Sequence, residues 1–264
     1  MASQTWNIIV VVAAGVGSLL SVILAIIHFV NWLRKRTGVV DVIFHHRPVL
    51  GFAAWGPAMQ VTMTLKAEKR DVFIKGMTLE VVRLKDKATH TMNWLLTLSG
   101  RRDVKKGDLS PIEGELAGGF SVLPQQPRMT EILFHDREVY ESIIKIREKL
   151  GEVFQNWADK EGYNLDETAL NPQSAKTIAK EFNSQRNSNF FSKTVDLFYF
   201  KPSDYECILK IVLKKGYIEK GFRFSLDEKK SKRLELNCVW VSQVFPLGET
   251  PTFFFESPKA DYSP

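Results

Sequence analysis

The hydrophobic pattern changes once along the chain, from an unbroken apolar stretch to alternating apolar and polar positions. Residues 8–30 read IIVVVAAGVGSLLSVILAIIHFV and contain no Asp, Glu, Lys or Arg. As an α-helix this stretch would extend roughly 34 Å, and the hydrocarbon core of a bilayer is about 30 Å thick. Trp6 and Trp32 flank the stretch, as indole rings do at the two headgroup levels. The pattern predicts a single transmembrane anchor within residues 1–37.

Two other interpretations of this stretch fit less well. A secretory signal peptide has basic residues before a shorter apolar run and a small-residue cleavage site after it. This sequence has neither. A helix in the core of a soluble domain would keep one polar face, whereas this stretch is apolar all round.

The charges beside the anchor predict its orientation. Residues 1–33 carry no charged side chain, and Arg34, Lys35 and Arg36 follow directly. Loops rich in Lys and Arg stay on the cytoplasmic side of a membrane. We therefore expect the N-terminus outside and residues 38–264 in the cytoplasm. The presence of only two cysteines and of no N-x-[ST] sequon agrees with a reducing compartment, although a periplasmic domain would also lack sequons.

One face of the predicted anchor carries small residues at every fourth position: Ala13, Gly17, Ser21 and Ala25. Such stripes let two membrane helices approach closely. Self-association of the chain through this face is one expectation. A plain monomeric anchor is the other, because small residues are common in any span.

After residue 38 the apolar positions alternate with polar ones. In the clearest case one face carries an apolar residue at every second position: Tyr205, Cys207, Leu209, Ile211 and Leu213. Similar strands are expected at residues 59–65, 92–98, 222–226 and 234–240, and weaker ones at 39–44, 72–84, 129–134 and 194–200. Alternation marks strands buried on one face, which favours antiparallel pairing. Several short strands of this kind predict a mainly β domain, an antiparallel β-sandwich spanning residues 38–264.

A helical insertion at about residues 136–192 interrupts the strands. Asp136 has the character of an N-cap, and apolar residues follow it at spacings of three and four up to Trp157. Asn171 and Pro172 then mark the start of a second helix, with Asn as the cap and Pro at the first helical position. The insertion is therefore expected to contain two helices.

The strand that carries Tyr205 and Cys207, together with a distant tryptophan, resembles those of immunoglobulin-like sandwiches, in which a tyrosine precedes a cysteine by two residues. In that family the partner cysteine comes earlier in the chain. No cysteine precedes Cys207 here, so the resemblance concerns architecture only.

Catalytic and metal-binding signatures are missing from the sequence. His45, His46, His90 and His135 lack the ligand spacing of a metal site, and neither H-E-x-x-H nor C-x-x-C occurs. The nucleophile motif G-x-S-x-G and the phosphate-binding motif G-x-x-x-x-G-K-[ST] are also absent. The glycines of residues 114–120 indicate a turn. The sequence predicts no cofactor and no metal, and it favours a protein without enzymatic activity.

Basic residues gather in one part of the predicted β domain. Residues 66–106 contain eleven Lys and Arg against five Asp and Glu, densest at Arg101, Arg102, Lys105 and Lys106. These four side chains are a candidate polyanion contact. Lipid is the nearer polyanion for an anchored domain, so we expect an anionic leaflet rather than nucleic acid as the partner. A solvated loop is the alternative.

Taken together, the patterns predict a membrane-anchored cytoplasmic module that binds another protein or acts as a sensor, with the helical insertion as its contact element. A membrane-tethered enzyme or ligand-gated effector, with a pocket between sandwich and insertion, is the first alternative. An extracytoplasmic adhesin-like domain is the second. The identity of a protein partner does not follow from the sequence.

Overall fold

The computed structural model of the chain describes residues 40–53, 55–99, 113–165, 172–186, 188–244 and 253–262. The predicted anchor, its flanking tryptophans, the stop at Arg34–Arg36 and the small-residue stripe lie outside these ranges. The four basic residues between Arg101 and Lys106 lie outside them too. Across the described ranges, no helix has the length and hydropathy that a membrane span requires.

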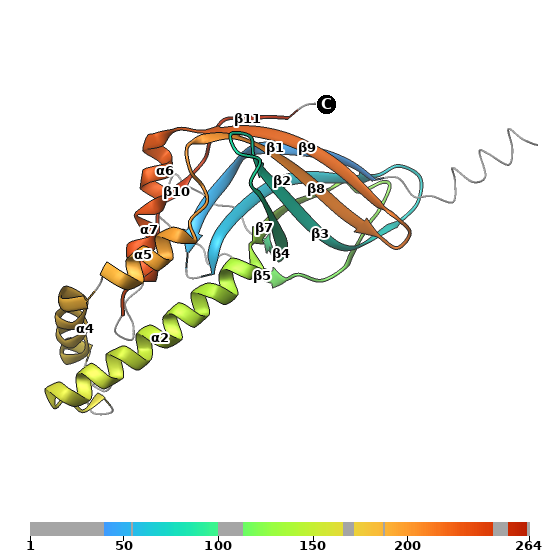
Figure 1. Ribbon diagram of the computed structural model, residues 1–264. Helices are drawn as coiled ribbons and strands as arrows, with labels where there is room; N and C mark the ends of the chain where they lie inside the picture. Colours follow the sequence, from blue (N-terminus) through green and yellow to red (C-terminus); the bar gives the residue numbers. More distant parts are fainter. Residues whose placement is uncertain are drawn as a thin grey trace, which may run out of the picture.

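The alternating segments form one antiparallel sheet (Figure 1). Its strands are β1 Val40–Ala53, β2 Gly56–Ala67, β3 Val72–Arg83, β4 Thr89–Ser99, β5 Glu113–Leu116, β6 Phe120–Val122, β7 Arg128–His135, β8 Ser203–Leu213, β9 Tyr217–Leu226, β10 Phe255–Glu256 and β11 Ala260–Asp261. They run in the order β10-β1-β2-β7-β4-β3-β8-β9-β11, with β5 added to β4 and β6 to β3. The prediction of a mainly antiparallel β protein is confirmed.

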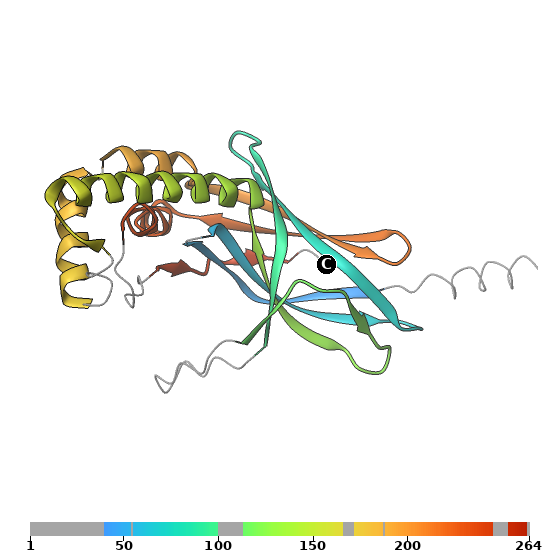
Figure 2. The ribbon, with the colours of Figure 1, turned by 90° about the horizontal axis from the view of Figure 1, so that it is seen from below.

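The sheet is a single curled layer, whereas the sequence pattern predicted the two separate sheets of a sandwich (Figure 2). Alternation reports only that one face of each strand is buried. It does not distinguish a face covered by a second sheet from a face covered by the same sheet curling around it. The immunoglobulin-like arrangement of two sheets is therefore corrected to one continuous curled sheet.

The inner face of the curl holds the main hydrophobic core. On β2 the side chains of Met59, Val61, Met63 and Leu65 are at most 1% exposed, and the residues between them face outward. Strands β1, β3, β7, β8 and β9 add apolar side chains to the same core. Burying one large apolar side chain stabilises a fold by about 1.5–3 kcal/mol, so the burial of this inner face stabilises the curled sheet.

The C-terminal strap, residues 253–262, joins the two edges of the curled sheet. Its strand β10 pairs with β1 through Leu50 and Gly51, and its strand β11 pairs with β9 through Phe224. Unpaired edge strands expose N–H and C=O groups that can pair with other chains. The strap occupies part of both edges at once.

A buried side chain holds the strap in place. Asn237 is 0% exposed, and its amide donates to the Phe254 carbonyl at 2.8 Å and accepts from the Phe254 N–H at 2.8 Å. Arg233 forms an ion pair with Glu256 at 3.2 Å. The side-chain amide of Asn237 thus supplies the hydrogen bonds that a neighbouring strand would make to the backbone of Phe254.

The helical lobe follows β7, and its described residues form α2 Arg137–Glu161, α4 Pro172–Arg186 and α5 Ser188–Asp196. The predicted start is confirmed, because the Asp136 carboxylate accepts the Val139 N–H at 3.1 Å. Helix α2 ends at Gly162, whose φ of 77° suits glycine. Among the described residues α4 begins at Pro172, as predicted, while the predicted cap Asn171 lies outside them, and α5 is a further helix that was not predicted.

Two predicted strands are helical in the structure. Residues 194–196 belong to α5, where the Thr194 hydroxyl donates to the Phe190 carbonyl one turn earlier at 2.9 Å. Residues 234–240 belong to α6 Glu228–Glu235 and α7 Asn237–Val241. Here Asp227 caps the helix by accepting the Lys230 N–H at 2.8 Å. A short apolar run is compatible with the period of a helix and with that of a strand. Here the cap favours the helix.

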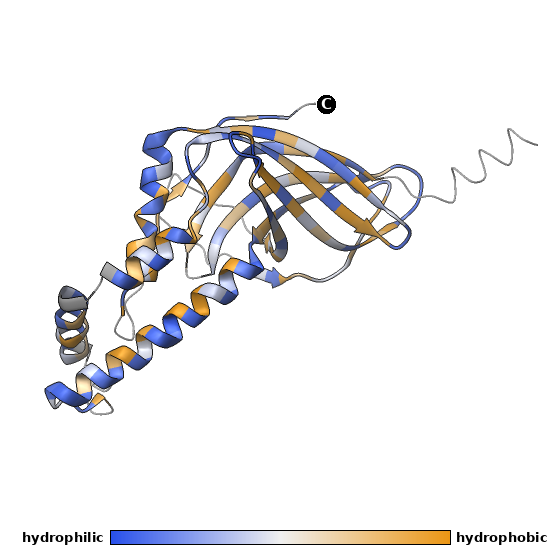
Figure 3. Ribbon diagram, in the orientation of Figure 1, coloured by the Kyte–Doolittle hydropathy of each residue, from blue (hydrophilic) through white to orange (hydrophobic). Residues whose placement is uncertain are grey.

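Helix α2 connects two hydrophobic cores (Figure 3). Near its start, Ile143 is buried in the core of the sheet. Its second half contributes Leu150, Trp157 and Ala158 to a second core, the lobe core. Helices α4 and α5 complete this core with Ile178, Phe182 and Phe190. The helix therefore holds the lobe beyond one end of the sheet (Figure 1).

Candidate functional site

Polar and aromatic side chains meet where α2 leaves the sheet. This junction cluster consists of His90 on β4, His135 at the end of β7, Asp136 at the cap of α2, and Tyr199 before β8. The His90 Nδ1 lies 3.7 Å from the Asp136 Oδ2. The His90 ring stacks on Tyr199 with 3.6 Å between ring centroids. Strand pairing and helix capping thus bring together residues that lie far apart in the sequence.

Asp136 is ionised in this cluster despite its burial. The residue is 5% exposed, and burial alone would raise the pKa of its carboxyl. The His90 ring and the Val139 N–H stabilise the carboxylate, and together they lower its pKa below the ordinary value. The carboxylate therefore has two roles, as a helix cap and as the partner of a histidine that is 29% exposed.

The other two members of the cluster are held in their neutral forms. Burial, and next the charge of Asp136, raise the pKa of Tyr199 well above the ordinary value. Within the described ranges, the Tyr199 hydroxyl and the His135 Nδ1 are buried without a hydrogen-bond partner. Burial also lowers the pKa of His135. A phenol and an imidazole with unused hydrogen-bonding capacity thus flank one carboxylate.

A histidine beside a carboxylate is a pair of side chains that enzymes use to transfer protons. Nucleophilic chemistry by cysteine is not supported, because burial raises the pKa of Cys207 well above its ordinary value and that of Cys238 to about 12. The described residues contain no group of three or more His, Cys, Asp or Glu that could hold a metal ion.

The remaining histidines lie on β1. His45 Nε2 is 2.6 Å from the Thr64 hydroxyl, and His46 has a φ of 49° at a break in the strand register. Their side chains differ in exposure, as expected for neighbours on a strand. His45 and His46 contribute to the edge of the sheet, and the junction cluster draws on His90 and His135 instead.

The basic rim is the end of the sheet at which the described chain begins. It comprises residues 40–43, 66–75, 120–129 and 210–220, and the register joins them through the pairs Val40 with Ala67, Val72 with Val122, and Ile74 with Leu213. The turns after β2, β6 and β8 lie side by side there (Figures 1 and 2). These segments contain nine Lys and Arg against four Asp and Glu.

The basic stretch predicted from the sequence is divided by the fold. Lys66, Lys69 and Arg70 lie on the basic rim, whereas Arg83 lies at the other end of β3, where it binds Asp86 at 2.6 Å. The structure adds Lys210, Lys214 and Lys215 from β8 and its turn, which are remote in the sequence. A linear count of charge could not find this grouping.

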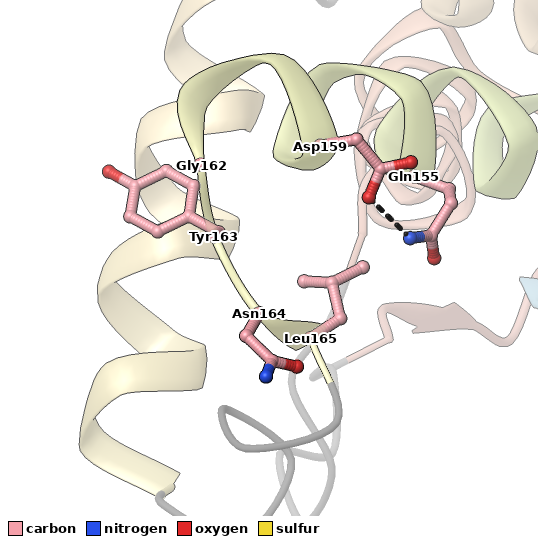
Figure 4. Close-up of a pocket in the computed structure, with 6 residues that line it drawn as sticks. All are labelled: Gln155, Asp159, Gly162, Tyr163, Asn164 and Leu165. Atoms are coloured by element: carbon pink, nitrogen blue, oxygen red, sulfur yellow. Dashed lines mark hydrogen bonds between the residues drawn. The ribbon is translucent and has the colours of Figure 1, made fainter.

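An open hollow of about 460 Å³ lies at the far end of α2 (Figure 4). It is lined by Gln155, Asp159, Gly162, Tyr163, Asn164 and Leu165. The Gln155 amide donates to Asp159 at 2.9 Å. Tyr163 donates to Glu181 at 3.1 Å, and this bond raises the pKa of the Tyr163 hydroxyl. The bond from Tyr163 fastens the chain after α2 to α4, whereas the bond from Gln155 lies within α2.

No family model matches the chain, and no curated protein or solved structure matches it either.

Proposed function

We propose that the protein is a single-pass membrane protein whose domain, residues 38–264, is a non-enzymatic interaction module in the cytoplasm. The supporting observation is that the start of the described chain and the helical lobe lie at opposite ends of the domain. The described chain begins at Val40 on the basic rim, and the helical lobe lies at the opposite end of the sheet (Figure 1). An anchor preceding Val40 would hold the lobe away from the bilayer, where a partner protein can reach it.

The helical end of the domain also differs from the rim in charge and surface. The insertion, residues 136–192, contains eight basic and ten acidic residues, so it has no affinity for an anionic surface. Phe191 on α5 and Leu236 between α6 and α7 are exposed at that end, by 36% and 53%. Exposed aromatic and aliphatic side chains among charged ones are typical of protein-binding surfaces.

A pair of topology reporters on the C-terminus of the full chain tests the orientation. A reporter active only outside the cytoplasm should stay silent, and one active only inside should give a signal. The reverse result would overturn the cytoplasmic assignment and favour the adhesin-like alternative.

Photo-crosslinking tests the contact element. A photoreactive residue at Phe191 of the full chain should give an adduct of one discrete mass in cells. The matched control is the same residue at Ser225, which is exposed on β9. Equal adducts at both positions, or none at Phe191, would argue against the lobe as the contact element.

The junction cluster favours a second candidate function, a ligand-gated effector or an enzyme. The pair of His90 and Asp136 lies between the sheet and α2, where that alternative expects its site. A small molecule that bound there would raise the melting temperature of the wild-type chain. It would have less effect on the His90→Gln variant, and an unchanged response in that variant would exclude the cluster as the site.

A further inference from the structure

The basic rim presents charge that is not neutralised by the fold. Lys69 and Arg70 in the turn after β2, and Lys214 and Lys215 in the turn after β8, are exposed. None of the four forms an ion pair with any residue that the structure describes. By contrast, Lys210 lies 3.8 Å from Glu219 and 3.9 Å from the centre of the Tyr217 ring. The turn residues therefore direct their charge into solvent.

Apolar side chains accompany this charge. Ile43 and Met129 both pair with Thr64 in the strand register, and they are 46% and 61% exposed. Further exposed apolar side chains lie at the strand ends of the same rim: Phe73 at 42%, Leu123 at 38%, Val212 at 36% and Tyr217 at 57%. Six of the large hydrophobic residues exposed in the described chain thus gather on the basic rim.

We infer that the basic rim binds the anionic headgroups of a bilayer and inserts its exposed apolar side chains between them. The inference rests on the proposed membrane function and identifies the surface of the domain that faces the lipid. Lys and Arg are attracted by an anionic leaflet over about one Debye length, and aromatic and aliphatic side chains enter the interfacial layer. The rim offers both kinds of side chain on one face.

The position of the rim along the chain agrees with this assignment. Arg34, Lys35 and Arg36 precede Val40 by only four to six positions in the sequence. Basic residues therefore occur in the sequence just before Val40, at positions 34–36, and the basic residues of the rim follow it. A nucleic acid would use the same charge but would leave the apolar side chains of the rim without a role, because its backbone contacts are polar.

Fluorescent labels on the full chain in lipid nanodiscs test the inference. The labelled positions are Ser121→Cys on the rim and, as a matched control, Ser192→Cys on the helical lobe, both exposed. Cys207 and Cys238 are 0% exposed, so the introduced thiol is labelled selectively. Discs contain either phosphatidylcholine alone or phosphatidylcholine with phosphatidylglycerol. Quenching by neutral acrylamide reports how far each label is shielded.

The rim label should be quenched severalfold less in anionic discs than in neutral ones, and high salt should remove the difference. The lobe label should be quenched equally in both. Reversing four rim charges (Lys69, Arg70, Lys214 and Lys215 to Glu) should abolish the protection. Reversing four exposed lobe charges (Lys145, Arg147, Lys149 and Lys160 to Glu) should leave it intact, which separates a surface effect from a general change of charge.

Three results would overturn the inference. Rim quenching that is the same in both disc types, in a chain retained by the discs, would refute lipid binding while the anchor stands. Protection that survives the reversal of the rim charges would show that proximity alone shields the label. Stronger protection of the rim label by RNA than by anionic discs would assign the rim to a nucleic acid.

A chain that is not retained by discs would overturn the proposed anchoring instead. In that case the same two labels are measured with the chain mixed with phosphatidylglycerol vesicles. Selective protection of the Ser121 position would still support the rim as a lipid-binding surface, and equal quenching of both labels would overturn it.

Discussion

The sheet and the helical lobe bury their apolar side chains in different ways. The core of the sheet joins strands from both halves of the chain, and the C-terminal strap returns to β1, where Ser257 donates to the carbonyl of Pro48 across 209 positions of sequence. The lobe core is built mainly from neighbours in sequence on α2, α4 and α5. We therefore expect the sheet to unfold as one cooperative unit and the lobe to open by itself.

The two regions are joined by few interactions besides α2. Asn183 on α4 donates to the Val244 carbonyl at 2.9 Å and accepts the Val244 N–H at 3.1 Å, which ties the lobe to the chain after α7. Asn237 makes the same pair of bonds to the strap. Asparagine side chains thus fasten both regions where no neighbouring strand is available.

The largest loss of stability is expected for Phe52→Ala in the core of the sheet. Phe52 is 0% exposed and packs edge-on against Phe198 with 5.6 Å between centroids. Truncating a buried phenylalanine costs about 3–5 kcal/mol because of lost burial and the cavity left behind. Denaturant unfolding followed by far-UV circular dichroism should show one transition at lower denaturant. A loss confined to the helical signal would contradict a cooperative sheet.

Trp157→Ala should affect the lobe core alone. Trp157 is 4% exposed and contacts Phe182 with 5.3 Å between centroids. We expect a local loss of about 3–5 kcal/mol, since a buried aromatic side chain is removed. Hydrogen exchange should quicken in the second half of α2 and in α4, and should stay slow in β2 and β8. Faster exchange in the strands as well would show that the two regions unfold together.

Asn237→Ala should release the strap. The substitution leaves the N–H and the carbonyl of Phe254 without their partner, and an unsatisfied buried polar group costs about 1–3 kcal/mol. Amide exchange in residues 253–262 should rise, with little change in β7 at the centre of the sheet. The control is Ser257→Ala, which removes one long bond of 3.3 Å to Pro48. A larger rise in exchange for Ser257→Ala than for Asn237→Ala would show that the bond from Ser257, and not Asn237, holds the strap.

The smallest effect concerns acid and the junction cluster. The pKa of Asp136 is lower in the folded chain than its ordinary value of 3.8. Its stabilising contribution is therefore present above that ordinary value and is lost as pH falls through the lower folded pKa. Asp136→Asn keeps a capping side chain but loses the charge beside His90, and its cost at pH 7 should be about 1 kcal/mol or less.

Thermal melting of both proteins at pH 7 and at low pH measures this difference. The gap between wild type and Asp136→Asn should shrink as the pH falls below 3.8. A gap that stays constant would mean that the variant acts through the helix cap and not through the carboxylate charge.

Local signals in the sequence were sufficient for the elements that depend on them. Asp136 begins a helix because its carboxylate satisfies an N–H of the first turn, and Pro172 begins another because it needs no donor there. The alternation from Tyr205 to Leu213 predicted a strand with one buried face. Each of these depends on neighbours within a few positions, so the sequence alone determines them.

Long-range contacts decided the rest. Whether alternating strands form two sheets or one curled sheet depends on which strands become neighbours, and β3 pairs with β8 across more than a hundred positions. The same pairing brings the basic residues of two hairpins to one rim, and the pairing of β4 with β7 brings His90 close to Asp136. Tertiary structure also favoured a helix at residues 234–240, because Leu234, Cys238 and Val241 pack into the core of the sheet at helical spacing. Periodicity and capping signals involve residues that are close in the sequence, so they do not indicate which distant strands pair. Only the folded sheet determines those contacts.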